Sequence, residues 1–187
     1  ETIHELPRIS GWCSREKAEK IMEFLYQARP MTCVEIGTFG GATTYPIVRS
    51  LQYLGKGSVW AVDAWDTQKA LEGLIPGSQA YIWWSKIDMN GLLGECRALL
   101  AYNGLSRRCH IVQSSSQAFL SSLHDDSIDF IYLDGTASSE GCLNDALLSC
   151  CKVKKGGYIW LNDSNLDTRL DAVAYLMDHC TWIEEYS

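Results

Sequence analysis

Short apolar runs alternate with helical patterns along most of the 187-residue chain, and this alternation is what most constrains the fold. The runs are apolar at consecutive positions, as expected of strands that are covered on both faces of a sheet. The predicted strands are 31–36, 58–62, 110–113, 128–133 and 158–161, and a sixth begins at 181. The predicted helices are 14–28, 42–53, 92–102, 116–123, 141–151 and 168–179. The sequence therefore predicts an α/β fold with a doubly wound, mostly parallel sheet and helices on both faces.

Composition excludes several classes of protein. The formal net charge is −7 and the pI is about 5.0, whereas nucleic-acid-binding domains normally present a basic face. No apolar run reaches the roughly 20 residues that a membrane-spanning helix needs, and the first residues do not form a secretory signal. Most of the 8 cysteines lie in apolar segments without a CxxC pair, which favours reduced thiols over disulfides or a zinc site. We therefore expect a cytoplasmic protein that binds neither nucleic acid nor membrane.

Polar residues stand at the carboxyl ends of the predicted strands, where open α/β sheets bind their ligands. In chain order they are Glu35 with a glycine loop behind it, Asp63, the serines at 114–116, Asp134, and Asn162 with Asp163. Most of these strands end at or beside a carboxylate. Because the carboxyl ends of parallel strands meet at one edge of the sheet, we expect a single binding site there.

The segment VEIGTFGGATT (34–44) places three glycines directly after the first predicted strand. Gly37, Gly40 and Gly41 do not follow the GxGxxG spacing of dinucleotide-binding loops, and the GK[ST] of a phosphate-binding loop is absent. Glu35, two positions before Gly37, would repel a diphosphate and would suit a ligand with a positive amino group. The segment is therefore predicted to hold a cofactor, and a plain turn between strand and helix is the alternative.

Several motifs resemble one known family. The run Glu35-Ile36-Gly37-Thr38-Phe39-Gly40-Gly41 looks like the E/D-x-G-x-x-x-G loop of class I S-adenosylmethionine-dependent methyltransferases, and Asp63 matches their acidic residue for the ribose hydroxyls. The runs IYLDG (131–135), SEG (139–141) and KGG (155–157) resemble a small-molecule O-methyltransferase branch. The resemblance covers about residues 33–164 and implies a Rossmann-like methyltransferase fold.

The resemblance also implies the cofactor contacts. The residues concerned are Glu35, Gly37, Thr38, Phe39, Gly41, Asp63, Ala64, Trp65, Ser115 and Asp134. The two loop glycines would let the backbone approach S-adenosylmethionine closely. Glu35 would face the methionine amino group, Asp63 would accept the ribose hydroxyls, and Ser115 would contact the adenine amino group. Alternatively, Glu35 is a surface charge and Asp63 a helix cap.

A metal site is implied less directly. Metal-dependent relatives place carboxylates after strands four and five, where they bind Mg²⁺ through oxygen. Asp134 and Asp163 match these positions, with Asn162 and Ser164 beside them, and as catalytic residues they would hold substrate oxygens. Ala137 stands where the branch commonly has His, Ser164 stands where catechol-type members have Asn, and no lysine lies near Asp134 in the sequence. The alternative is that these carboxylates line the cleft without a metal.

We expect a single domain over residues 1–187, with an N-terminal helical segment (1–30), a cofactor-binding core (31–164) and a lid or substrate insert (66–90). In the insert, Trp83 and Trp84 either cover the substrate or anchor the segment by packing. The family's final antiparallel strand is expected to be missing, because the chain stops within the sixth predicted strand. The sheet edge left exposed would favour a homodimer.

The implied function is transfer of a methyl group from S-adenosylmethionine to an oxygen of a small-molecule acceptor, with Mg²⁺ as a further cofactor if the carboxylates bind it. Two other functions stay open. Ala137 and Ser164 are compatible with a cofactor-binding module that has lost catalysis. A nicotinamide-dependent oxidoreductase is disfavoured by the spacing of the glycines.

Overall fold

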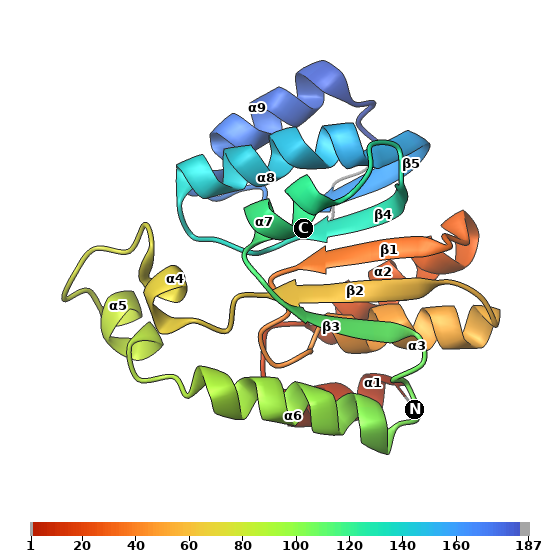
Figure 1. Ribbon diagram of the computed structural model, residues 1–187, viewed down its shortest axis with the longest axis horizontal. Coiled ribbons are helices and arrows are strands. Elements are labelled where there is room, and N and C mark those ends of the chain that lie inside the picture. Colours follow the sequence, from red (N-terminus) through yellow and green to blue (C-terminus); the bar gives the residue numbers. More distant parts are fainter. Residues whose placement is uncertain (1, 184–187) are drawn as a thin grey trace.

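The computed structural model describes residues 2–183, and at its centre lies a five-stranded sheet in the order β3-β2-β1-β4-β5 (Figure 1). The strands are β1 (Thr32–Ile36), β2 (Ser58–Asp63), β3 (Cys109–Gln113), β4 (Ile128–Leu133) and β5 (Val153–Leu161). Every neighbouring pair is parallel, so all carboxyl ends lie along one edge. The predicted doubly wound, parallel α/β sheet is confirmed.

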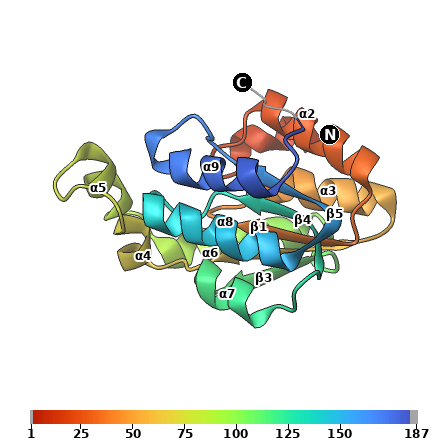
Figure 2. The same cartoon turned by 90° about the horizontal axis from the view of Figure 1, so that it is seen from above.

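Helices cover both faces of the sheet (Figure 2). On one face lie α2 (Arg15–Ala28) and α3 (Thr44–Leu54), while α6 (Met89–Tyr102) runs beside β3 and joins the same apolar cluster. On the other face lie α7 (Ser116–Ser122) and α8 (Ser139–Lys152), and α9 (Leu170–His179) packs on α8.

Successive side chains of β1 point to opposite faces of the sheet and belong to two apolar clusters, one on each face. Cys33 belongs to the cluster under α2 and α3, whereas Val34 and Ile36 belong to the cluster under α7. All four residues from Cys33 to Ile36 are buried, as expected for a central parallel strand. Glu35 therefore points into the α3 side of the molecule, away from water.

The chain before α2 and the insert contain short helices that the sequence did not predict. They are α1 (Thr2–Glu5), η1 (Leu6–Arg8), α4 (Thr67–Leu71) and α5 (Gln79–Trp84). The insert thus contains regular structure, in which Asp66 and Ser78 cap its two helices by accepting hydrogen bonds from the backbone of Lys69 and Tyr81.

The fifth strand begins earlier than predicted. The Lys-Lys-Gly-Gly run at 154–157 predicts a turn before the strand, but β5 already starts at Val153. Val153 pairs with Ile128 and Tyr158 with Phe130, so β5 carries three more residues here than β4 does. A bulge containing Gly156, with φ of +79°, absorbs them. The prediction of a turn here was wrong because a bulge uses the same residue types.

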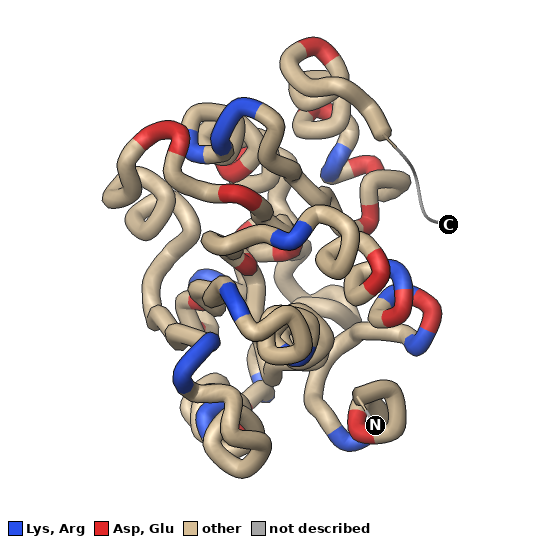
Figure 3. The backbone as a smooth tube through the Cα atoms, turned by 90° about the vertical axis from the view of Figure 1, so that its right-hand side faces the viewer, with Lys and Arg blue, Asp and Glu red and all other residues tan. Residues whose placement is uncertain are grey.

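Two further expectations concern the ends of the sheet and the surface. Residues 181–183 do not form the predicted sixth strand, and residues 184–186 lie outside the described part of the chain. Within the described residues, no helix has both the length and the apolar character needed to cross a bilayer. On the side of the molecule shown in Figure 3, acidic and basic positions are interspersed.

Candidate functional site at the carboxyl edge of the sheet

The carboxyl ends of β1 and β4 lie side by side, and the chain leaves them toward opposite halves of the sheet. Such a switch in strand order opens a crevice that α/β proteins use for ligands. The glycine loop (residues 37–41) follows β1 at this point, and Asp134 follows β4. In Figure 1 the insert, with α4 and α5, lies beyond the same strand ends.

Close packing explains the glycines of the loop. Gly37 has φ of +92°, and a Cβ there would collide with the backbone carbonyl of Asp134. Gly41 has φ of +96°, and its Cβ would lie 3.2 Å from the Sγ of Cys96 on α6. A Cβ at Gly40 would meet the backbone of Ser10. The loop is thus held between β4, α6 and the N-terminal segment.

Glu35 is fully buried at the end of β1, so the alternative of a surface charge is wrong. Its Oε2 accepts hydrogen bonds from the hydroxyls of Thr38, at 3.2 Å, and Thr44. Its Oε1 is buried and has no hydrogen-bond partner in the described part of the chain. Burial raises the pKa of Glu35 to about 8, against the opposing effect of the two hydroxyls. A buried carboxylate oxygen without a donor fits a ligand that brings one, such as an amino group.

Asp63, at the end of β2, binds two backbone amides. Its Oδ2 accepts from the N–H of Phe39 at 2.9 Å, and its Oδ1 accepts from the N–H of Trp65 at 2.8 Å. Phe39 and Trp65 have φ of 51° and 41°, a left-handed conformation that side chains disfavour. The indole N–H of Trp65 also donates to the carbonyl of Phe39 at 2.9 Å. Asp63 therefore holds the glycine loop and the β2 end in one arrangement.

The carboxylate of Asp63 still has room for hydroxyl donors. Burial raises its pKa, and the backbone amides of Trp65, Phe39 and Ala64 lower it. Each carboxylate oxygen can accept about two hydrogen bonds, so these amides do not use all of its acceptor positions. Ribose hydroxyls would fit what remains. Ala64 stands between Asp63 and Trp65 along the chain.

Ser115 caps α7, where its Oγ accepts from the N–H of Ala118 at 3.3 Å. The preceding N–H of Ser114 donates to the carbonyl of Asp63 at 2.9 Å, so this turn lies against the end of β2. The structure thus brings Ser115 to the same region as Asp63. Its contact with adenine stays a prediction.

The ends of β4 and β5 bring together the predicted catalytic and metal-binding residues. The N–H of Asn162 donates to the carbonyl of Leu133 at 3.0 Å, which places it beside Asp134. Burial raises the pKa of Asp134 to about 6, and a hydrogen bond from Asn162 opposes this. The charge of Asp163 also raises the pKa of Asp134, so the two carboxyl groups interact. Asp163 itself is exposed, with φ of 52°.

Two cationic side chains at this place were missed by the sequence analysis. The Nζ of Lys17, from the first turn of α2, donates to the Oδ1 of Asn162 at 2.9 Å. Arg169 is 5% exposed, its Nη1 donates to the carbonyl of Thr136, and its Nη2 lies 3.7 Å from the Oδ1 of Asp134. Both cations lower the pKa of Asp134. No lysine lies near Asp134 in the sequence, but the fold brings Lys17 to this place from helix α2.

The donor set does not fit Mg²⁺. The Oδ1 of Asn162 already accepts from Lys17 and, at 2.8 Å, from the hydroxyl of Tyr132. Arg169 stands against Asp134, so a divalent cation would meet two positive charges. In residues 2–183, no three His, Cys, Asp or Glu side chains are grouped so that they could hold a metal ion.

Four aromatic rings meet over the glycine loop, and we call them the aromatic cluster: Trp12, Phe39, Trp83 and Trp84. The centroid of the Trp12 ring lies 5.1 Å from that of Phe39 and 5.5 Å from that of Trp83. The Trp84 centroid lies 5.4 Å from that of Phe39. Trp12 is 60% exposed and Trp83 is 43% exposed. The cluster joins the N-terminal segment, the glycine loop and α5.

Besides the aromatic cluster, the insert makes a second contact at the carboxyl edge of the sheet, with the start of α8. A Cβ on Gly73, in the turn after α4, would collide with Ser138 at the start of α8. The insert therefore runs from the end of β2 to the connection after β4. Together with the aromatic cluster, it borders the strand ends where the candidate residues gather.

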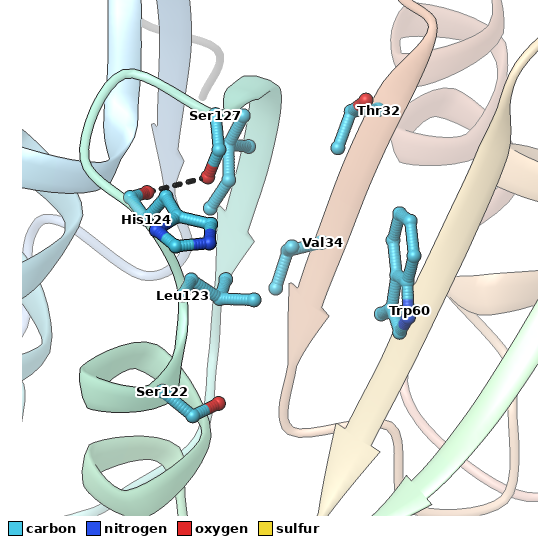
Figure 4. A pocket seen from close by; sticks show the side chains of 8 residues that line it. Thr32, Val34, Trp60, Ser122, Leu123, His124 and Ser127 are labelled. Carbon is cyan, nitrogen blue, oxygen red and sulfur yellow. Dashed lines mark hydrogen bonds between the residues drawn. The ribbon is translucent and has the colours of Figure 1, made fainter.

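A small cavity lies elsewhere. It has a volume of about 180 Å³ and is lined by Val34, Trp60, Leu123 and neighbouring residues (Figure 4). Thr32 and Ile128, which also line it, are the first residues of β1 and β4. It thus opens at the amino ends of the strands, away from the candidate site.

Fold and site together define an α/β domain of the type that binds a nucleoside-containing cofactor at its switch point. A family model described as a methyltransferase domain matches residues 34–164, which is more than half of the chain. The chain therefore belongs to this methyltransferase family. No curated protein sequence matches it.

Solved structures of low sequence identity share the fold. A methyltransferase of Podospora anserina bound to SAH has a TM-score of 0.66 at 12% identity, over 89% of this chain and 71% of that one. An O-methyltransferase of Bacillus cereus in complex with SAH has a TM-score of 0.64 at 16% identity, over 95% and 77%. A precorrin-6y C5,15-methyltransferase of Geobacter metallireducens has a TM-score of 0.62 at 18% identity, over 90% and 72%.

Proposed function

We propose that this protein transfers a methyl group from S-adenosylmethionine to an oxygen atom of a small molecule. The observation that carries the proposal is the convergence of Glu35 and Asp63 on one glycine loop at the switch point of the sheet. Membership of the methyltransferase family supports the reaction. The names of the O-methyltransferases with the same fold support the acceptor atom.

Each end of the cofactor would meet a different carboxylate. Asp63 would accept the ribose hydroxyls, with Ala64 and Trp65 along the nucleoside. The unpartnered Oε1 of Glu35 would accept from the amino group of the methionine portion. Gly37, Thr38 and Gly41 would contribute backbone to the wall between them. When bound, the cofactor supplies an electrophilic methyl group on a sulfonium sulfur.

The protein's own contribution is to bind and align. An acceptor oxygen must lie in line with the methyl carbon and the sulfur, and fixing this geometry is a large part of the rate enhancement in such displacements. Asp134 and Asn162, at the neighbouring strand ends, would border the acceptor. The insert and the aromatic cluster would restrict water at the reacting atoms.

Calorimetric titration of the purified chain with S-adenosylmethionine, SAH and NAD tests the class of cofactor. We expect binding of the first two and none of NAD, and loss of binding in Asp63→Ala. Binding of NAD alone would refute the proposal and favour a nicotinamide-dependent oxidoreductase.

Turnover of radiolabelled methyl groups onto a panel of phenols, carboxylic acids and sugars tests catalysis. The expected result is labelled product with an oxygen acceptor. Tight cofactor binding with no product from any acceptor class would instead indicate a binding module.

A further inference from the structure

Lys17 breaks a local rule of helix chemistry. It is the third residue of α2, and its N–H donates to the capping Ser14 at 3.1 Å. Glu or Gln usually occupies this position and completes a capping box. A cation in the first turn also opposes the helix dipole, whose positive end lies there. Residues that break local rules without a local compensation often serve a site.

The interaction that offsets this unfavourable position of Lys17 lies at the end of β5. The ammonium of Lys17 donates to the Oδ1 of Asn162, which is 145 residues away in sequence and is 6% exposed. It also lies 3.4 Å from the carbonyl oxygen of Trp12. The fully buried Tyr132 donates to the same oxygen of Asn162, which fixes the amide as an acceptor toward Lys17.

The ammonium therefore stands among the residues that a metal would need. Asn162 is its hydrogen-bond partner, and its charge reaches the carboxyl of Asp134. Arg169 supplies a second cation, because its Nη2 lies 3.7 Å from the Oδ1 of Asp134. The carboxyl group of Asp134 thus lies within the influence of two positive charges, which leaves little attraction for a divalent cation.

Resting on the function proposed above, we infer that the ammonium of Lys17 takes the place of a metal ion and binds the acceptor oxygen. An ammonium has three N–H donors, and Asn162 and Trp12 account for two of them within the described residues. The third is available to a substrate. Preorganised donors of this kind stabilise charge on a reacting oxygen.

The acceptor that suits this arrangement carries a negatively charged oxygen, such as a phenolate or a carboxylate. A lone pair of that oxygen forms the new bond to the methyl carbon, and the electron pair of the broken carbon–sulfur bond stays on sulfur. The oxyanion and the sulfonium are both neutralised, so no proton has to move. Lys17 acts by holding the oxyanion in line.

A first test needs no substrate. Mn²⁺ is titrated into the wild-type chain, Lys17→Gln and Lys20→Gln, and free Mn²⁺ is measured by electron paramagnetic resonance. We expect Lys17→Gln to bind Mn²⁺ at least about tenfold more tightly than the wild type, because the competing charge is gone. Lys20, exposed on the same helix, should behave as wild type. Equal Mn²⁺ affinity in the wild type and Lys17→Gln would overturn the inference.

A second test measures methyl transfer in EDTA. The wild type should keep its rate, and Lys17→Gln should lose about 100-fold or more in kcat, while Lys17→Arg recovers part of it. Calorimetry should show an S-adenosylmethionine affinity for Lys17→Gln within about threefold of wild type. Loss of wild-type turnover in EDTA, or full turnover by Lys17→Gln, would refute the inference. Failure of the wild type to bind cofactor would refute the proposed function instead, and the Mn²⁺ comparison would still decide where the ammonium lies.

Discussion

At the scale of single residues, two buried carboxylates define the candidate cofactor site, and their surroundings differ. Glu35 has two hydroxyl donors on one oxygen and, among residues 2–183, none on the other, whereas both oxygens of Asp63 accept backbone amides. Burial raises the pKa of both groups. The first carboxylate is thus poised to gain a donor from a ligand, and the second mainly shapes the loop around it.

The pKa of Glu35 predicts how stability depends on pH. It rises from 4.5 to about 8 on folding, so the folded state binds an extra proton between these values. The contribution of this group to the free energy of unfolding is fully present at or below about pH 4.5 and is lost as the pH rises through 8. The free energy of unfolding of Glu35→Gln, relative to that of the wild type, should therefore increase by a few kcal/mol from pH 5 to pH 8. Urea unfolding of both proteins across this range measures the gain, and parallel pH profiles would contradict it.

Removing the carboxylate of Asp63 should destabilise the fold as well as the site. Asp63→Ala leaves the amides of Phe39 and Trp65 without their acceptor, at a cost of about 2–4 kcal/mol. Asp66→Ala is the matched control, because Asp66 also accepts a backbone amide but caps an exposed helix, where the loss is about 1 kcal/mol. Urea unfolding measures the loss of free energy of unfolding in each variant. Equal losses would show that Asp63 does not hold the glycine loop to the end of β2.

At the scale of elements, the insert is attached through rings and not through the sheet. Its helices α4 and α5 contain no buried residue. The contacts that hold it are Trp65 and its neighbours on α6, the aromatic cluster and the approach of Gly73 to Ser138. Segments with little burial open more readily than the core, as the predicted role of the insert as a lid requires.

Truncating one ring should loosen this attachment. Trp12→Ala removes the partner of Phe39, Trp83 and Trp84, and each such ring pair contributes about 0.5–1.5 kcal/mol. We expect faster hydrogen exchange and several-fold faster proteolysis within the insert. Tyr102→Ala, at a 92% exposed position outside the cluster, should change neither rate. Unchanged hydrogen exchange and proteolysis of the insert in Trp12→Ala would show that the ring contacts do not stabilise its position.

Much of the fold followed from the sequence because periodicity and strand-end chemistry are local. The run at 34–36 and the carboxylate at 63 identify two strands and the edge that they share. The bulge in β5 was missed because Lys-Lys-Gly-Gly is as typical of a turn as of a bulge. Lys17 was missed for a different reason: its partner Asn162 is set by tertiary structure alone, and the only local sign was an imperfect capping box.

At the scale of the whole molecule, the last two long helices of the described chain pack on each other. Helix α9 packs on α8 through Ala172, Cys142 and Ala146. Near its end, the Sγ of Cys180 lies 3.7 Å from the Sγ of Cys150 on α8. These two thiols are close enough to join the two helices covalently with a small adjustment. Cys33, Cys96, Cys109 and Cys142 are buried, whereas Cys151 and Cys180 are exposed.

Oxidation should therefore link α8 to the end of α9. Burial raises the pKa of Cys150 to about 12, so little thiolate is present at neutral pH and the disulfide should form slowly, and faster at alkaline pH. Closing a loop of 30 residues should stabilise the chain by about 3.6 kcal/mol. Intact mass and non-reducing peptide mapping measure the bond, with Cys180→Ser as control. Pairing of Cys151 instead would contradict the prediction.

The hydrogen bond between Lys17 and Asn162 also determines when the candidate site can assemble during synthesis. Lys17 belongs to the first long helix, and Asn162 follows the last strand of the described sheet. Chains are made from the amino end, and contacts between distant positions form after local ones. The ammonium must wait until β5 has been made before it meets its partner. A nascent chain that ends before β5 can build helices and an early sheet, yet it cannot assemble the pair at which we place the acceptor.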